Sequence, residues 1–389
     1  MKKALCAIAL SLSLSHAQAS VVQPHEQFEQ EIKSTLIPLS GKSIAGLKVI
    51  YLGADIGPWL DTGMSVQPGE RVSILLNGKV WLSRHYDISL EAPIQVWRRI
   101  GPEGKISRGQ QATDTFVADQ GGTIQLKNLP TRWLNTQGAY QGEPAPFNPD
   151  AGGGISVAVI RWAPGTDVAA ELAKLAVREN SPPWSKAEAK RLKTASRQPD
   201  GWQYLWELGP ADIFSEHHAD GRDGGPSHRI DAHTHNDVAI LQKEVDLPLS
   251  TETALQWSWK VDKLPALAAE TNAISHDYVS IAVEFENGKD LTYLWSRELP
   301  VGLSFPCPLE GWKDRETHIV ARSGTGDLGK WLNESHNVLA DYEKAIGGPA
   351  PGRIVRVWLI ANSVFGRGEG RAQFGNIQLN DGPATRAIW

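Results

Sequence analysis

Short runs of apolar and β-branched residues, separated by turn-forming residues, recur along most of this chain of 389 residues. Glycine and proline, which interrupt regular structure, number 37 and 24. Short strands at roughly ten-residue spacing are typical of antiparallel sandwiches and barrels. The sequence therefore predicts a mostly β protein.

The apolar runs fall into two groups. The first contains KVIYLG, RVSILLNGKVWLS, PIQVWRRI, TIQLKN and GISVAVIRW, with turns expected at Pro68-Gly69 and Asn77-Gly78. The second contains RIDAHTHNDVAILQKEVDL, ALQWSWKVD, DYVSIAVEFE, DLTYLWS, THIVARS, RIVRVWLIANS and AQFGNIQL. No regular helices alternate with these strands, so we expect two β-sandwiches, the second of jelly-roll type.

A helical hairpin is expected between the two groups. Residues 165–180 form an alanine-rich helix, and Ser185 to Glu188 read as a capping box that opens a second helix running to about Arg197. The expected organisation is a signal peptide (1–19), an N-terminal segment (20–46), a first sandwich (47–164), a helical linker (165–200) and a second sandwich (201–389).

One amphipathic helix is predicted inside the second sandwich, over residues 324–349. Apolar side chains recur there at steps of three and four, with Thr325 or Asp327 as the cap and Gly347, Gly348 and Pro349 as the stop. Asn337 and Asp341 lie on its polar stripe and are candidate ligand-binding residues.

The same stretch carries a resemblance. Gly329-Lys-Trp331, Asn337-Val338, Asp341-Tyr342 and Gly347, followed by IVRVWLIANS and AQFGNIQL, resemble a bacterial exported family known as the domain of unknown function number three thousand and forty-seven. The resemblance covers about residues 202–379. It implies a fold but no activity.

A second, shorter resemblance lies in the first sandwich. The segment PWLDTGMSVQPGERVSILLNGKVW is similar to the entry hairpin of galactose-binding-type lectins, a likeness that extends over about 57–162. Calcium-dependent lectins of this kind bind the ion through a late loop, where this chain offers Asn148 and Asp150. Because Ca²⁺ takes six to eight oxygens, the cofactor stays open, with calcium as one candidate.

The first twenty residues indicate export. Lys2 and Lys3 precede an apolar run, and Ala17-Gln18-Ala19 predicts cleavage before Ser20, which places the protein in the periplasm or outside the cell. Without the leader only Cys307 remains, read as a small buried side chain without a disulfide partner. No later run is long enough to span a membrane, and a net charge of -5 without basic blocks excludes a nucleic-acid footprint.

Two pairs of residues are candidates for catalysis. Glu284 and Glu286 are two apart on a predicted strand, so both carboxylates project from one face, as the acid and nucleophile of a glycoside hydrolase do. His276 and Tyr278 are candidates for a polysaccharide lyase, in which a histidine or tyrosine abstracts a proton. A solvated strand face is the alternative interpretation of the glutamates.

Two histidines and two aspartates are weak metal candidates. His233, His235 and Asp237 alternate along one predicted strand, and Asp150 lies apart from them in the late loop of the first sandwich. A straight strand rises about 3.3 Å per residue, so His233, His235 and Asp237 reach one ion only if the strand bends. The favoured expectation is that no metal binds here.

Several tryptophans are candidates for sugar binding. Trp257 and Trp259 share one face of a strand, and Trp295 lies in another. Indole rings stack on sugars, although a paired tryptophan face also suits a core. The leading hypothesis is an exported carbohydrate-recognition protein whose partner is a polysaccharide or other glycan. The alternatives are a glycan-cleaving enzyme on the second sandwich and an envelope assembly factor; the oligomeric state is open.

Overall fold

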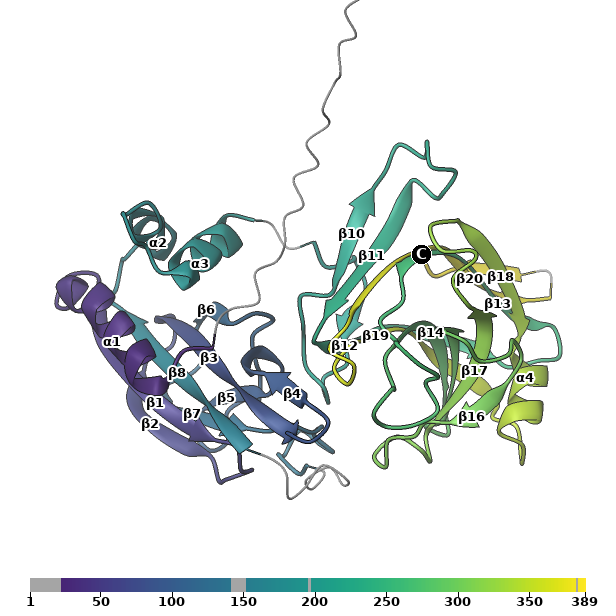
Figure 1. Cartoon of the computed structure of the whole chain (residues 1–389), viewed down its shortest axis with the longest axis horizontal. Helices are drawn as coiled ribbons and strands as arrows, with labels where there is room; N and C mark the ends of the chain where they lie inside the picture. The colour runs from purple at the N-terminus through teal and green to yellow at the C-terminus, as the bar shows by residue number, and fades with distance from the viewer. Residues whose placement is uncertain (1–21, 141–151, 195–196, 383) are drawn as a thin grey trace, which may run out of the picture.

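The computed structural model of the chain describes residues 22–140, 152–194, 197–382 and 384–389. The predicted signal peptide, Asn148 and Asp150 lie outside these residues. The expected second linker helix ends at Lys193, short of the predicted end at about Arg197. The chain forms two groups of facing sheets, one from each half of the sequence, drawn in purple to teal and in teal to yellow (Figure 1). The mostly β fold is confirmed.

The described residues of the N-terminal half form two sheets and three α-helices. Its elements are α1 (His25–Leu36), β1 (Ile44–Gly53), β2 (Leu60–Val66), β3 (Arg71–Ser83), β4 (Ile88–Glu91), β5 (Val96–Ile100), β6 (Thr113–Val117), β7 (Gly122–Asn128), β8 (Gly152–Trp162), α2 (Val168–Ala176) and α3 (Pro183–Lys193), with short 3-10 turns at Ile37–Leu39 and Ala92–Ile94. One sheet has the order β1-β8-β3-β4, with β6 also on β3, and the other β2-β7-β5. Their facing apolar side chains, such as Ile74, Ile124 and Val157, form the core between them.

The predicted turn at Asn77-Gly78 is wrong. These residues lie inside the long strand β3, which continues to Ser83. Gly78 has φ 127°, and a Cβ at this position would meet the Gly154 carbonyl at 2.3 Å. Glycine is therefore required by the close approach of β8 and by the backbone conformation, not by a reversal of the chain.

The two helices expected to form a linker instead cover a sheet. α2 and α3 pack with α1 on the outer face of the β1-β8-β3 sheet, where Leu172, Trp184 and Ile160 belong to one buried apolar cluster. The predicted capping box is also wrong, because α3 begins at Pro183 and the Ser185 hydroxyl donates to the Pro182 carbonyl. Glu188 is fully buried and accepts hydrogen bonds from Arg191 at 2.6 and 2.7 Å.

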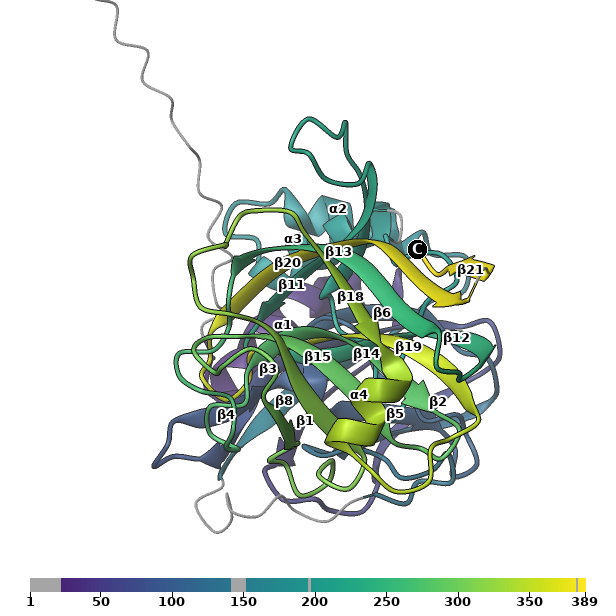
Figure 2. The ribbon, with the colours of Figure 1, turned by 90° about the vertical axis from the view of Figure 1, so that its right-hand side faces the viewer.

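The C-terminal half is a sandwich of a six-stranded and a seven-stranded sheet. Its elements are β9 (Gln203–Tyr204), β10 (Phe214–His218), β11 (His228–His235), β12 (Val238–Pro248), β13 (Thr253–Lys263), β14 (Tyr278–Phe285), β15 (Asp290–Ser296), β16 (Ser304–Pro306), β17 (Glu316–Ser323), β18 (Leu332–Asn337), α4 (Val338–Ala345), β19 (Arg353–Asn362), β20 (Glu369–Asp381) and β21 (Ala384–Ala387). The orders are β10-β11-β20-β13-β18, with β21 on β20, and β16-β17-β15-β14-β19-β12-β9. Figure 2 shows the two layers one above the other. Within the described residues of this half, neighbouring strands are antiparallel except β15 with β17.

The first part of the predicted helix is a strand. Residues Leu332–Asn337 pair with β13, so that Glu334 lies opposite Trp257, and only Val338–Ala345 is helical. Alternate side chains of this segment are half-buried, the period of a strand. The cap is Asn337, whose Oδ1 accepts from the Ala340 N–H at 2.9 Å, and the predicted stop at Gly347 and Gly348 is confirmed by their positive φ.

The two halves contact one another through side chains. Trp97 and Trp133 of the first half pack against Trp206 of the second, and Leu82 and Leu90 pack against Val364. Arg132 joins the halves by an ion pair with Glu207 at 2.6 Å and a hydrogen bond to the Gly311 carbonyl at 2.9 Å. No helix among the described residues is long and apolar enough to cross a membrane.

Candidate functional site

The seven-stranded sheet presents buried polar side chains on the face turned away from its core. In β14 the side chains of Val279, Ile281 and Val283 enter the core between the sheets, whereas Tyr278 and Ala282 belong to a separate cluster on the outer face. Several polar side chains lie buried near this outer surface: Ser280, Glu284, Asp290, Thr292, Glu316 and His318. Buried polar groups need hydrogen-bond partners, and such groups gather at functional sites, so this face is the candidate site.

Three carboxyl groups lie side by side across this face. Strand register places Glu284 opposite Asp290, and Asp290 opposite Glu316. Burial and the neighbouring Glu316 carboxyl raise the pKa of Asp290 well above its usual range, and burial raises the pKa of Glu316. The Thr292 hydroxyl lies 2.9 Å from Asp290 Oδ1 and 3.3 Å from Glu316 Oε1, within hydrogen-bonding reach of both.

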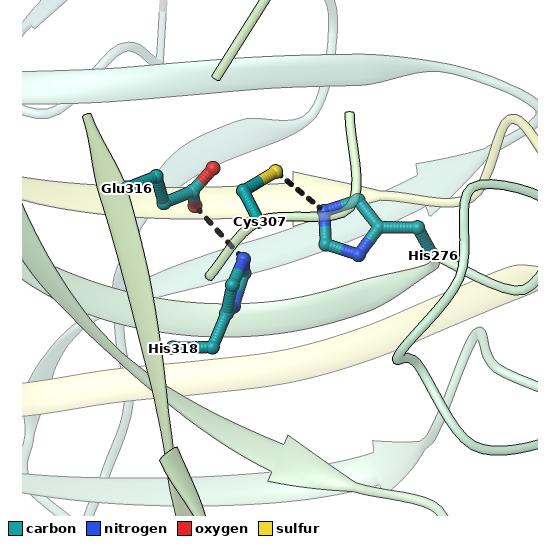
Figure 3. Close-up of side chains that lie close together, drawn as sticks. All are labelled: His276, Cys307, Glu316 and His318. Atoms are coloured by element: carbon teal, nitrogen blue, oxygen red, sulfur yellow. Dashed lines mark hydrogen bonds and ion pairs between the residues drawn. The ribbon is translucent and has the colours of Figure 1, made fainter. Parts of the chain in front are cut away.

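Glu316 is also one of four buried residues whose polar atoms converge. His276 precedes β14, Cys307 follows β16, and Glu316 and His318 are two apart on β17, as Figure 3 shows. Cys307 Sγ lies 3.3 Å from His276 Nε2, and His318 Nε2 lies 3.5 Å from Glu316 Oε1. One donor atom of each residue lies within 4.8 Å of the other three.

The hydrogen bonds fix how His276 is oriented. Its Nδ1 lies 3.1 Å from the Glu270 carbonyl oxygen, which can only accept, so Nδ1 carries the hydrogen. Nε2 then presents a lone pair toward the Cys307 thiol, which donates to it. Burial lowers the pKa of His276 to about 4 and holds the pKa of His318 well below its usual range, so both rings are neutral at pH 7.

A cavity of about 720 Å³ lies between the two halves, beside this cluster. Its apolar lining includes Leu82, Leu90, Ile94, Val238, Ile360 and Phe365, and its polar lining includes Arg108, Arg132, His276, Tyr278, Glu316 and Asn362. Small-molecule sites typically measure about 300–1,000 Å³ and combine an apolar wall with a few converging polar groups. The cavity has both properties.

Arg108 brings a positive charge to the cavity wall. Its side chain is buried, and its guanidinium donates to the Leu208 carbonyl at 2.6 and 3.0 Å and to the Pro93 carbonyl at 2.8 Å. These are neutral acceptors, and no ion pair of Arg108 is found among the described residues. Burial without a carboxylate contact lowers its pKa to about 9. A buried cation of this kind favours an anionic group placed nearby.

The structure separates the two predicted catalytic glutamates. Glu284 is buried between Arg315 and Arg356, at 3.1 and 2.9 Å. Glu286 lies beyond the end of β14, is exposed, and accepts from the Gly352 N–H at 2.7 Å. The two arginines balance the negative charge of the Glu284 carboxylate. Glu286 contacts neither of these arginines in the described residues. The paired carboxylates of a retaining glycosidase are therefore not formed by these two residues.

His276 and Tyr278, the other predicted pair, do come together. Their ring centroids lie 4.8 Å apart, and both residues line the cavity. The Tyr278 hydroxyl donates to Glu316 Oε1 at 2.9 Å, and burial raises its pKa well above the usual value. Tyr278 therefore holds its proton, which does not suit a catalytic base.

The tryptophans predicted to bind sugar are buried in the core. Trp257, Trp259 and Trp295 are at most 1% exposed. Trp259 packs edge-on against Trp257, with ring centroids 5.5 Å apart, and lies 5.4 Å from Trp295. None offers an open ring face to a ligand, because all three fill the space between the two sheets.

The predicted ligand residues on the helix have structural partners. Asn337 caps α4 and also donates from Nδ2 to the Thr251 carbonyl at 2.7 Å. Asp341 accepts from the Tyr293 hydroxyl at 3.0 Å and pairs with His336 at 3.2 Å. Neither lies among the cavity-lining residues.

The weak metal candidates do not converge. His233 and His235 are exposed on β11, and His233 Nε2 pairs with Glu369 at 2.8 Å. Neither histidine belongs to the groups of close metal donors that the described residues form, and Asp150 lies outside these residues.

Three residues of the cluster were missed from sequence. Glu316 and His318 stand in ETHIVARS, where a spacing of two places both side chains on one face of a strand. Cys307 was predicted to be small and buried, and the burial is confirmed, but its neighbours could not be predicted. The spacing of Glu316 and His318 was the available signal.

Comparisons with known proteins support the family resemblance. Residues 217–378 match the model of a family described as "Protein of unknown function (DUF3047)". This match confirms the resemblance predicted for the second half of the chain. The comparison with curated proteins found no match.

Solved structures show distant similarity only. The EclA N-terminal domain, a PllA-like lectin, shares 16% identity over 29% of this chain and 95% of its own, with a TM-score of 0.23. The xyloglucanase domain of NopAA from Sinorhizobium fredii shares 10% sequence identity, with 48% of this chain and 96% of its own covered, and a TM-score of 0.29. A family 30 carbohydrate-binding module from Clostridium thermocellum shares 11% sequence identity, with 49% of this chain and 96% of its own covered, and a TM-score of 0.27. Similarities this distant assign neither a ligand nor a reaction.

Proposed function

We propose that the protein is an exported carbohydrate-binding protein whose ligand, a small glycan with an acidic group, occupies the cavity between the two halves. The observation that carries the proposal is the cavity itself, which combines an apolar wall, converging polar groups and the buried cation of Arg108. The signal peptide predicted at the N-terminus supports export to the periplasm or beyond.

An aromatic side chain of the cavity wall can support a sugar ring. Trp312 lines the cavity and is only partly buried, unlike the core tryptophans. The guanidinium groups of Arg132 and Arg315 lie 4.9 and 5.5 Å from its ring centroid. An indole face stacks on the apolar face of a pyranose.

The polar groups of the cavity are suited to hydroxyl and carboxylate groups. Asn362 and Tyr278 offer hydrogen-bonding atoms on one wall, while Arg108 and Arg132 offer cationic donors. Arg132 forms an ion pair with Glu207, whereas Arg108 has no carboxylate partner among the described residues. Arg108 is therefore the cation that can pair with an anionic ligand. A uronate or another acidic sugar therefore fits better than a neutral one.

The experiment is a binding screen that also detects turnover. The mature protein is mixed with neutral and uronate-containing oligosaccharides, its unfolding temperature is measured with each, and the mixtures are analysed by mass spectrometry. Binding predicts a higher unfolding temperature with acidic sugars, because a ligand of the folded state stabilises it. If no sugar changes the unfolding temperature, the carbohydrate proposal is wrong.

The same mixtures test the glycan-cleaving alternative. Products that have gained water would establish a hydrolase, and unsaturated products would establish a lyase, for which His276 lies at the cavity wall. Intact sugar together with a raised unfolding temperature supports binding without cleavage.

A further inference from the structure

We propose that His276, Cys307, Glu316 and His318 bind a divalent transition metal ion, with Zn²⁺ as the best fit. The four residues come from the connection before β14, the segment after β16 and strand β17, and their polar atoms point toward one another (Figure 3). This inference stands apart from the carbohydrate proposal, since it rests only on the cluster.

The donor types favour zinc. Two imidazole nitrogens, one thiolate sulfur and one carboxylate oxygen are the three kinds of ligand that Zn²⁺ takes in proteins, most often four at a time. Calcium and magnesium are disfavoured, because they prefer sites made of oxygen alone. Thiolate and carboxylate together also cancel the two positive charges of the ion, so the occupied site has no net charge in a buried environment.

The spacing of the donors agrees with a single four-coordinate ion. Zinc–ligand distances of about 2.0–2.3 Å in a tetrahedron place neighbouring donors about 3.3–3.6 Å apart. Cys307 Sγ and His276 Nε2 are 3.3 Å apart, and His318 Nε2 and Glu316 Oε1 are 3.5 Å apart. All four donors already lie within 4.8 Å of one another, so small side-chain movements complete the site.

His318 supplies an independent indication of a missing partner. Its side chain is 0% exposed, and neither ring nitrogen has a hydrogen-bond partner within the described parts of the chain. Leaving a buried imidazole without partners is costly. An ion at the centre of the cluster would occupy the Nε2 lone pair that faces Glu316.

The surroundings orient the ligands as metal sites require. Histidine ligands usually donate their other ring N–H to a carbonyl or carboxylate, as His276 does from Nδ1 to the Glu270 carbonyl. The carboxylate Glu316 is held by the hydroxyl of Tyr278 at 2.9 Å. His276 and Glu316 also line the cavity, so the ion would lie at its wall.

The test is metal analysis and cobalt spectroscopy on the untagged chain from Ser20 onward, which omits Cys6 together with the predicted signal peptide. Protein purified without chelators is expected to contain one zinc per chain by elemental analysis. Exchange for Co²⁺ is expected to give the near-ultraviolet charge-transfer band of a cobalt–thiolate bond, for which Cys307 is the available sulfur in the mature protein. If cobalt added in excess gives no thiolate band in the correctly folded wild type, the proposal is wrong.

Variants assign the ion to these residues. A second, exposed group of donors exists at Glu216, His218 and His228, and it serves as the control. The double variant His218→Gln with His228→Gln is expected to keep one zinc, whereas Cys307→Ser and His318→Gln are each expected to lose it. Full zinc content in both of the latter would overturn the assignment. If either fails to fold by circular dichroism, the wild-type cobalt spectrum decides.

Discussion

At the residue scale, the site depends on a few buried polar groups whose partners are far apart in sequence. His276, Cys307 and Glu316 are drawn together by the packing of loops on β17 and not by any local motif. Sequence spacing identified His276 and Tyr278 as candidates, and both line the cavity. Sequence spacing could not place Cys307 beside them. The residues around Cys307, Pro306 and Pro308, do not indicate where this segment crosses the sheet.

Arg108 should decide whether the ligand is acidic. We expect Arg108→Gln to weaken binding of a uronate-containing oligosaccharide by roughly tenfold or more, since a charge-assisted hydrogen bond contributes about 1.5–3 kcal/mol. Binding of a neutral sugar should change much less. Isothermal titration calorimetry with both sugars measures the difference, and Arg108→Lys is the control that keeps the charge. Equal losses for the two sugars would contradict the role assigned to Arg108.

Asp237 should make stability depend on pH. Burial raises its pKa to about 6, although the hydrogen bonds from the Thr234 hydroxyl and the His235 N–H lower it. Arg108 also interacts electrostatically with Asp237. Because the folded pKa lies above the unfolded value, the contribution of Asp237 to stability is full below about pH 4 and is lost as pH rises through about 6.

The variant Asp237→Asn tests this dependence. Asp237 Oδ1 accepts from the Thr234 hydroxyl and the His235 N–H at 2.6 and 2.7 Å, and an amide oxygen can accept both. We expect urea denaturation to show that the wild type loses stability relative to Asp237→Asn between pH 4 and 7. A difference that does not change with pH would exclude the raised pKa.

At the element scale, strands were predicted better than the helix. The alternation of apolar side chains in DYVSIAVEFE identified β14 and its two faces, because a period of two needs no knowledge of the neighbouring strands. The segment Leu332–Asn337 fits both periods, and its pairing with β13 makes it a strand. The pattern of this segment could not predict the pairing, because β13, the strand with which it pairs, lies about 75 residues earlier in the sequence.

The cap of α4 is a test of that corrected boundary. Replacing Asn337 by alanine removes the acceptor for the Ala340 N–H, and we expect a loss of about 1–2 kcal/mol in the free energy of unfolding. Asn337→Asp keeps the capping oxygen but loses the bond to the Thr251 carbonyl, so its loss should be smaller. Urea denaturation compares the two variants. An unchanged stability in Asn337→Ala would place the start of the helix elsewhere.

At the scale of the whole molecule, the two groups of sheets were predictable and their contact was not. Each group is recognisable in the sequence as a run of successive strands, whereas the interface is formed by scattered residues such as Leu90, Trp206 and Val364. Neither periodicity nor spacing marks these residues. The cavity is lined by both halves, so the sequence of neither half predicts it. The division into domains at 47–164 and 201–389 stays a prediction.

The central claim is that the cavity between the halves binds the ligand, and filling it is the most direct test. Ala273 lines the cavity, while Ala268 is exposed on the same connection between β13 and β14 and is not part of the lining. The measurement is calorimetric titration of an acidic oligosaccharide that stabilises the wild type into Ala273→Trp and Ala268→Trp. We predict that Ala273→Trp loses affinity at least tenfold while Ala268→Trp binds as the wild type does. Equal, undiminished binding by a folded Ala273→Trp would contradict the claim.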